Sequence, residues 1–202
     1  ENGGVLSVWA EGKAGDIEVN GGDSSSPTSY AAVNGTAGDI TIGGNAALNG
    51  SGTLRNVRAH MGGNVFPGNT VDKFATLTTT GNVTFDKGSF FSVQIANDGL
   101  RFSKLAAQGQ ATLDGGSVKV RAEDFAGTDS QGNAIPQFLS EQQVKNLFQK
   151  SFVILTAEKG LTGRFEKIEP NYNYITPLLA YTDKTVSVGF DLTETALSLF
   201  LP

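Results

Sequence analysis

The chain has 202 residues, of which 17% are charged, with a formal net charge of −5 and no cysteine. The lack of cysteine excludes disulfides and thiolate metal sites and suits export through an oxidising periplasm, and the lack of a Lys/Arg cluster argues against nucleic acid or an anionic membrane as a partner. No run of about 20 apolar residues occurs, so we expect no membrane insertion of this segment.

Short segments that alternate apolar and polar residues predict β-strands through the first 120 residues. In chain order they are Val5–Trp9, Ile17–Val19, Ile40–Ile42, Thr53–Val57, Ala75–Thr78, Asn82–Phe85, Phe91–Ile95 and Ser117–Val120. Gly-Gly, Asn-Gly and Asp-Gly pairs separate them, and these residues tolerate the positive φ angles of tight turns. Strands this short could build a sandwich, a barrel or a solenoid.

Two internal repeats favour the solenoid. The segment Ala14–Val19 returns 23 residues later as Ala37–Ile42, and Gly81–Phe90 returns 28 residues later as Gly109–Val118. Periods in the twenties are typical of stacked supersecondary units, each of which buries its inward face only against its neighbours. We therefore predict an all-β fold, a parallel β-helix.

One segment after these repeats departs from the strand pattern. Ser140 and Gln143 have the spacing of a capping box, which predicts the start of a short α-helix. Val144, Leu147 and Phe148 then fall on one helix face. We expect this inserted helix to flank the rod and bury its apolar stripe there; the alternative is a helix that binds a partner.

Strand patterns return beyond the helix. Ser151–Thr156 is a continuous apolar run, as in a strand covered on both faces. Phe165–Ile168, Leu178–Tyr181 and Thr185–Phe190 follow, and the residues between Tyr181 and Thr185 are typical of a hairpin connection. Because the Gly-Gly repeats stop here, we predict a C-terminal strand cap on the solenoid.

The predicted organisation has three parts. These are β-helix coils over residues 1–123, a loop and short helix insert over residues 124–150, and a C-terminal β cap over residues 151–202. Glu1 leads directly into strand-like sequence without a secretory leader, so we expect a piece of a longer protein. Loops that leave a solenoid often carry its contacts, which makes residues 22–29 and the insert candidate contact regions.

A series of short motifs runs in order from about Gly35 to Leu192. They are Gly50-Ser51-Gly52-Thr53-Leu54, Pro67-Gly68-Asn69-Thr70, Gly81-Asn82-Val83-Thr84-Phe85, the stretch Leu105–Val118, Phe152–Ala157 with Gly163-Arg164-Phe165, and Tyr181 with Thr185–Val188. Their order resembles the C-terminal passenger region of bacterial autotransporters. The resemblance implies a right-handed parallel β-helix whose last coils and cap, about residues 81–196, form an autochaperone region that folds first and templates the rest.

The same resemblance implies a non-catalytic role. The chain would be the membrane-proximal stem that nucleates passenger folding and supports surface display of an adhesin or virulence factor. Its partners would be the protein's own outer-membrane barrel, expected after Pro202, and the outer-membrane assembly machinery, with export to the bacterial cell surface. Two alternatives stay open: a protease or lipase domain upstream of Glu1, or a host-receptor or self-association surface within this segment.

No catalytic, cofactor-binding or metal-binding residue is expected, and no ligand-binding residue can be named. The expected site residues are structural and belong to the folding nucleus: Gly81, Phe85, Gly88, Gly109, Leu113, Gly116, Val118, Val153, Leu155 and Phe165. Of these, Leu113 and Val153 are expected to lie in the core, where a charge would unfold the chain.

Catalytic chemistry has one candidate, His60, the only histidine. A Ser-His-Asp triad would have to use it, with Asp72 near in sequence, but no Gly-x-Ser-x-Gly elbow is present. We expect His60 to be a turn residue.

Two pairs of aspartates, Asp16 with Asp39 and Asp86 with Asp114, lie one period apart and could stack into ladders. We expect repeated polar turn residues, and stacked like charges with raised pKa values or weak calcium binding are the alternative.

Four aromatic residues, Trp9, Tyr30, Tyr172 and Tyr174, are candidate contact residues. Trp9 lies in an alternating strand and is expected to be a core or cap residue. Tyr172 and Tyr174 lie in a loop-like context.

Overall fold

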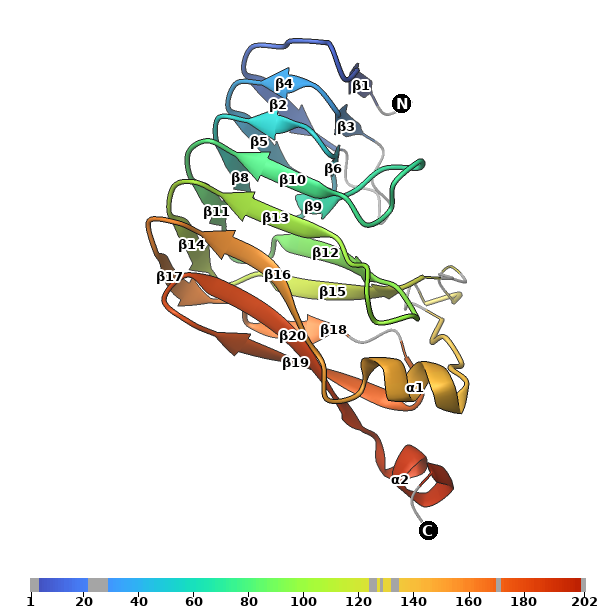
Figure 1. Cartoon of the computed structure of the whole chain (residues 1–202). Coiled ribbons are helices and arrows are strands. Elements are labelled where there is room, and N and C mark those ends of the chain that lie inside the picture. Colours follow the sequence, from blue (N-terminus) through green and yellow to red (C-terminus); the bar gives the residue numbers. More distant parts are fainter. Residues whose placement is uncertain are drawn as a thin grey trace.

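The chain winds into a rod of stacked coils. The structure is a computed structural model that describes residues 4–21, 29–123, 127, 129–131, 135–169 and 172–200. The N-terminal coil lies at one end of the rod, and a C-terminal hairpin and helix lie at the other (Figure 1). Strands that follow each other along the chain enter three different sheets in turn, so each sheet is assembled from successive coils. The predicted parallel β-helix is confirmed.

The three sheets together hold all the named strands. Sheet A contains, in spatial order, β1 (Val5–Val8), β3 (Tyr30–Val33), β6 (Ala47–Gly50), β9 (Asn64–Pro67), β12 (Phe90–Ile95), β15 (Ser117–Ala122) and β18 (Lys167–Glu169). Sheet B contains β4 (Thr36–Ala37), β7 (Thr53–Leu54), β10 (Thr76–Thr79), β13 (Lys104–Ala107), β16 (Ser151–Ala157), β20 (Thr185–Leu192) and β19 (Ile175–Tyr181). Sheet C contains β2 (Ile17–Asn20), β5 (Ile40–Gly43), β8 (Val57–Ala59), β11 (Val83–Phe85), β14 (Ala111–Asp114) and β17 (Leu161–Arg164).

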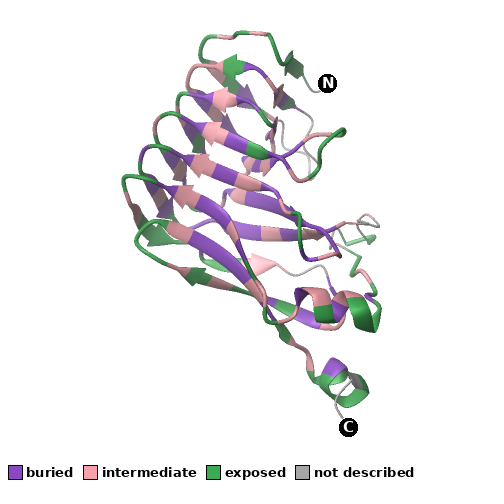
Figure 2. Ribbon diagram, viewed as in Figure 1, coloured by how far each residue is buried: buried purple, intermediate pink, exposed green. Residues whose placement is uncertain are grey.

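The core runs along the inside of the rod as columns of equivalent residues. In sheet B, Leu77 pairs with Leu105 and Leu105 pairs with Leu155, and all three are fully buried. Alternating strand residues point inward and are buried, while their neighbours face outward (Figure 2). Each buried leucine contributes about 1.5–3 kcal/mol relative to an exposed one, so stability depends on stacking coils in register.

The coils differ in length. Residues in equivalent corner positions are 23, 17, 26 and 28 residues apart along the chain. The longest interval follows β15, where the predicted insert precedes β16. Residues 151–169 then add one strand to each sheet, so a further coil precedes the terminal hairpin.

Two predicted strands are interrupted by corners. The segment Thr53–Val57 is not one strand: β7 ends at Leu54 and β8 begins at Val57. The Arg55 N–H donates to carbonyls of the previous coil, which turns the chain from sheet B into sheet C. Phe165 likewise lies at a corner between β17 and β18 and points into the core.

The predicted helix is confirmed as α1 (Glu141–Leu147). The Gln143 N–H donates to Ser140 Oγ, and the Ser140 N–H donates to Gln143 Oε1, which is the predicted capping box. Val144 and Leu147 are buried in the common core, as expected for a helix that flanks the rod. Phe148, which ends the helix, is only partly buried.

A second short helix, α2 (Glu194–Phe200), was not predicted. Thr193 starts it, because Thr193 Oγ1 accepts from the Ala196 N–H. Within the described residues, neither α1 nor α2 is long and apolar enough to span a membrane. The candidate contact loop at residues 22–28 and parts of the insert, residues 124–126, 128 and 132–134, lie outside the described residues.

At the C-terminal end of sheet B, the strands are no longer all parallel to one another. Strand β16 runs parallel to β13 on one side but antiparallel to β20 on the other, and β20 pairs with β19 in a hairpin. Thr182 and Thr185 close its turn, with the Thr182 N–H donating to the Thr185 carbonyl. The predicted hairpin is therefore confirmed. The predicted start of the cap at residue 151 is wrong, because β16, β17 and β18 continue the parallel pairing as a further coil.

Candidate functional site

Phenylalanine rings fill the centre of the last coils. Phe85 of β11, Phe91 of β12 and the corner residue Phe165 form a triangle with ring centroids 5.2, 5.3 and 6.0 Å apart. Each aromatic pair contributes about 0.5–1.5 kcal/mol beyond the area that it buries. This triangle joins residues that are 80 positions apart in the chain, so it links the repeat to the final coil.

A second aromatic cluster joins the rod to the hairpin. Phe152 contacts Phe102 and Phe190, with ring centroids 5.5 and 6.0 Å apart, and Tyr172 contacts Phe190 at 5.4 Å. Tyr172 is buried, and its burial raises the pKa of its hydroxyl well above the usual value. Tyr172, one of the four candidate contact aromatics, therefore belongs to the core and is not exposed. Tyr174 is half-buried and its ring packs against Phe138.

The residues expected to form the folding nucleus occupy three kinds of position. Those that point into the core are Phe85, Leu113, Val118, Leu155 and Phe165. Those at corners and turns are Gly81, Gly109, Gly88 and Gly116, the last two with φ angles of +77° and +80°. Val153 is the exception and is corrected here: it is partly exposed, because a register shift in β16 turns Ile154 and Leu155 inward. The role of these residues in folding stays a prediction.

Polar residues stack at the corner where sheet B leads into sheet C. The Asp39 N–H donates to Asp16 Oδ1 over 2.9 Å, the Asn82 N–H to Asn56 Oδ1 over 2.6 Å, and the Gln110 N–H to Asn82 Oδ1 over 2.9 Å. Between Asp39 and Asn56 the contact is made by the side chains, because Asn56 Nδ2 donates to Asp39 Oδ1. We call this column the corner ladder. It satisfies backbone donors that the strands leave unpaired, as expected of a repeated polar turn residue.

One arginine pairs with both aspartates of the corner ladder. Arg55 reaches both, with Nε 2.6 Å from Asp39 Oδ1 and Nη2 2.8 Å from Asp16 Oδ1. Hydrogen bonds from Arg55 and then Asn56 lower the pKa of Asp39 to about 2. The alternative of stacked like charges with raised pKa values is wrong for Asp39, because Arg55 pairs with the carboxylates of both Asp16 and Asp39. No group of three or more potential His, Asp or Glu metal ligands occurs among the described residues.

We expect Asp39→Asn to keep the fold at neutral pH, because Asn56 and Asn82 already occupy equivalent corners. The pKa of Asp39 falls from 3.8 to about 2 in the folded state, so its stabilisation is present above pH 3.8 and is lost as the pH falls towards 2. Urea midpoints at pH 7 and pH 2.5 should therefore differ less in the variant than in the parent chain. An equal acid-induced drop in both would contradict this account.

The only histidine is engaged in a turn contact. His60 Nδ1 bonds Asp86 Oδ2, and Arg58 binds both oxygens of the same carboxylate over 3.1 Å. Burial raises the pKa of Asp86, but the hydrogen bonds from Arg58 and His60 outweigh it and the net pKa is lowered. His60 thus pairs with Asp86, not with Asp72, which instead accepts from the Phe74 N–H. Asp86 makes its contacts with Arg58 and His60, not with Asp114 as a ladder would require.

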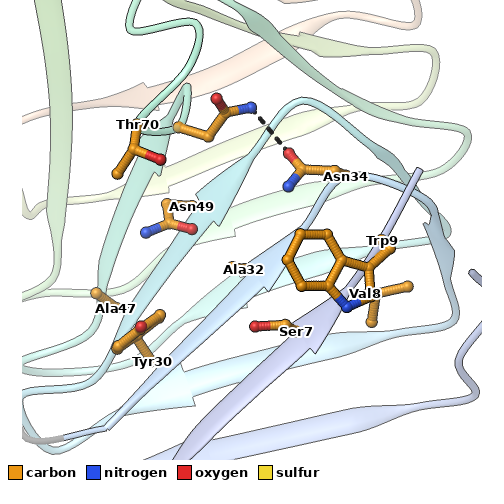
Figure 3. A pocket seen from close by; sticks show the side chains of 10 residues that line it. Ser7, Val8, Trp9, Tyr30, Ala32, Asn34, Ala47, Asn49 and Thr70 are labelled. Carbon is orange, nitrogen blue, oxygen red and sulfur yellow. Dashed lines mark hydrogen bonds between the residues drawn. The ribbon is translucent and has the colours of Figure 1, made fainter.

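An open groove crosses the outer face of sheet A at its N-terminal half. It encloses about 480 Å³ between strands β1, β3 and β6 and the turn after β9 (Figure 3). Its lining residues are Ser7, Val8, Trp9, Tyr30, Ala32, Asn34, Ala47, Asn49, Asn69 and Thr70. A second hollow of about 220 Å³ adjoins it and shares Asn49, Asn69 and Thr70. We call the two together the sheet A groove.

Trp9 and the asparagines define the sheet A groove. Trp9 is 76% exposed, so its expected place in the core or cap is wrong, and Tyr30 is 40% exposed on the same face. Asn69 Nδ2 donates to Asn34 Oδ1 over 3.0 Å, which ties the turn after β9 to the corner after β3 (Figure 3). Sequence reasoning missed Asn34 and Asn49, because the register of sheet A brings them near Trp9 across offsets of 25 and 17 residues that no repeated sequence marks.

The fold and these sites define the class of protein: a parallel β-helix with a hairpin-capped end, an aromatic core in its last coils and a groove on its outer face. No protein-family model matches the chain. Two curated relatives, both named extracellular serine protease of Serratia marcescens, are 35% identical over 158 residues and 31% identical over 183 residues.

These matches cover 78% and 90% of this chain but only 14% and 15% of the relatives. The chain therefore spans about a seventh of the length of the curated relatives that it matches. Together with the stacked parallel coils, the similarity supports the expectation that the chain is a segment of a secreted autotransporter passenger.

Proposed function

We propose that this chain is the membrane-proximal, non-catalytic stem of an autotransporter passenger, and that it nucleates folding of the passenger during surface display. The observation that carries the proposal is the concentration of aromatic packing in residues 81–196, the expected autochaperone region. Both phenylalanine clusters lie there, as does the antiparallel hairpin. A folding nucleus needs contacts beyond the strand pairing that every coil shares, and the aromatic clusters supply such contacts between the last coils, which supports the proposal.

The rest of the passenger is proposed from the relatives. Their printed name favours an extracellular serine protease domain elsewhere in the full protein over an adhesin. Within this chain no serine lies in a Gly-x-Ser-x-Gly elbow, which supports a stem without catalysis of its own. The proposed location is the bacterial cell surface or the extracellular medium, reached through the periplasm and outer membrane. The proposed partners are the protein's own outer-membrane barrel and the outer-membrane assembly machinery.

Native-state hydrogen exchange on the whole chain tests the nucleus. We expect amides of β12, β13 and β16 to exchange only through global unfolding, whereas amides of β1 to β5 should open at lower free energy. Phe165→Ala should slow refolding, whereas Ile40→Ala, an equally buried site in an early coil, should mainly speed unfolding. Equal protection at both ends, or slow refolding only in the Ile40 variant, would place the nucleus elsewhere.

A further inference from the structure

The sheet A groove has an unusual combination of shape and charge. None of the ten side chains that line its larger hollow is charged, and Lys73 is the single charged residue of the smaller one. The outer face is different farther along the same sheet, where Lys119 stacks on Phe90 and pairs with Glu169. The larger hollow of the groove is therefore an uncharged region of this face.

Several polar groups in the groove are available to a ligand. Within the part of the chain that the structure describes, the side chains of Trp9, Tyr30, Asn49 and Thr70 make no hydrogen bond to another residue. The Asn49 amide lies at the centre of the groove, with Trp9 on one side and Tyr30 on another (Figure 3). Together they present hydroxyl, indole N–H and amide groups, which serve as both donors and acceptors.

The groove is also held in shape before any ligand arrives. Tyr30, Ala32, Ala47 and Asn49 lie on paired strands of sheet A. On the rim, Asn34 Oδ1 accepts from Asn69 Nδ2 and from the N–H of Ser51. A rigid wall lowers the entropic cost of binding, because few side chains need to be ordered.

We propose that the sheet A groove binds a neutral oligosaccharide. An exposed indole offers a flat apolar face to the C–H side of a sugar ring, while amide and hydroxyl groups bond its hydroxyls. The groove lacks the Arg/Lys pairs that recognise phosphate, sulfate or carboxylate, so an anionic ligand does not fit. With strands about 4.8 Å apart, the span from β1 to β9 is about 15 Å, enough for a short chain of sugar rings.

The chain contains one tryptophan, so its fluorescence reports on this groove alone. We would titrate the 202-residue chain with maltohexaose, cellohexaose and chitohexaose, and in parallel with a heparin hexasaccharide. A saturable change in Trp9 emission is expected with at least one of the three neutral sugars and not with heparin. No saturable change with any neutral sugar at millimolar concentration, or saturation by heparin alone, would overturn the proposal.

Two variants separate binding from folding. Asn49→Ala keeps Trp9 as the reporter and removes the central amide, and we expect it to weaken sugar binding about tenfold or more. Gln108→Ala removes an exposed amide after β13, away from the groove, and should bind like the parent chain. Both should keep the parent circular dichroism spectrum. Equal affinity of all three proteins would overturn the proposal, as would an emission change that depends on protein concentration alone, which would identify a second copy as the occupant.

Discussion

Replacing Leu113 with aspartate is expected to unfold the chain at neutral pH. Leu113 is 1% exposed and lies in a column between Phe85 and Gly163. An unpaired carboxylate there loses its hydration without gaining a partner, which costs several kcal/mol. That cost is a large part of the roughly 5–15 kcal/mol by which a domain of this kind is stable. Circular dichroism and thermal melting check the result.

Thr112→Asp is the matched control for this substitution. Thr112 is the preceding residue of the same strand β14, but its side chain points outward and is partly exposed. The same carboxylate should therefore shift the melting temperature by only a few degrees. If the Leu113→Asp and Thr112→Asp variants had the same melting temperature, the assignment of the inward face of sheet C would be wrong.

Gly109→Ala is expected to destabilise the rod although it adds a single methyl group. Gly109 has no positive φ, so alanine fits its backbone, but the new Cβ would overlap Asn82 Oδ1 and the Gly81 carbonyl in the coil beneath. Overpacking of this kind typically costs about 1–3 kcal/mol, and here the contacted atoms belong partly to backbone that cannot rotate away. We expect a fall of several degrees or more in the melting temperature.

Gly15→Ala tests whether stacking is the cause. Gly15 occupies the same corner position in the first described coil, also without a positive φ, and nothing lies within 4 Å of its added Cβ. Alanine there should be neutral or stabilise the chain by about 0.4–1 kcal/mol, because it restricts the unfolded chain. Equal destabilisation by both substitutions would show that corner glycines matter for a reason other than close coil stacking.

The coil architecture can be predicted from the sequence where alternating apolar residues and a corner glycine recur together at one interval. The repeat of Gly81–Phe90 in Gly109–Val118 corresponds to adjacent coils with Phe85 paired to Leu113, since period two defines the inward face and glycine marks the corner. The coils 17 and 26 residues long cannot be recognised in the sequence. The corner residue changes from Asp39 to Asn56, so the repeated sequence motif is lost there.

Side-chain direction is less predictable in two places. A continuous apolar run such as Ser151–Thr156 carries no alternation, so it cannot reveal that a register shift turns Ile154 and Leu155 inward and leaves Val153 outside. Trp9 follows the last residue of β1, where the strand period no longer fixes direction. The groove beside it depends on residues such as Asn34 and Asn69, which are 35 positions apart and come together only when β3, β6 and β9 pair in register.

The antiparallel β19–β20 hairpin makes the two ends of the rod unequal. Strand β20 runs antiparallel to β16, and β19, the last strand of sheet B, runs antiparallel to β20 and therefore again in the direction of β16. The hairpin lengthens sheet B alone, because β18 and β17 are the last strands of sheets A and C. Filaments form when the tail of one molecule fits the head of the next in an open series. Because the three sheets end at different levels here, a second rod that stacked on β19 would not continue sheets A and C, and copies packed together would not polymerise through continued coil stacking.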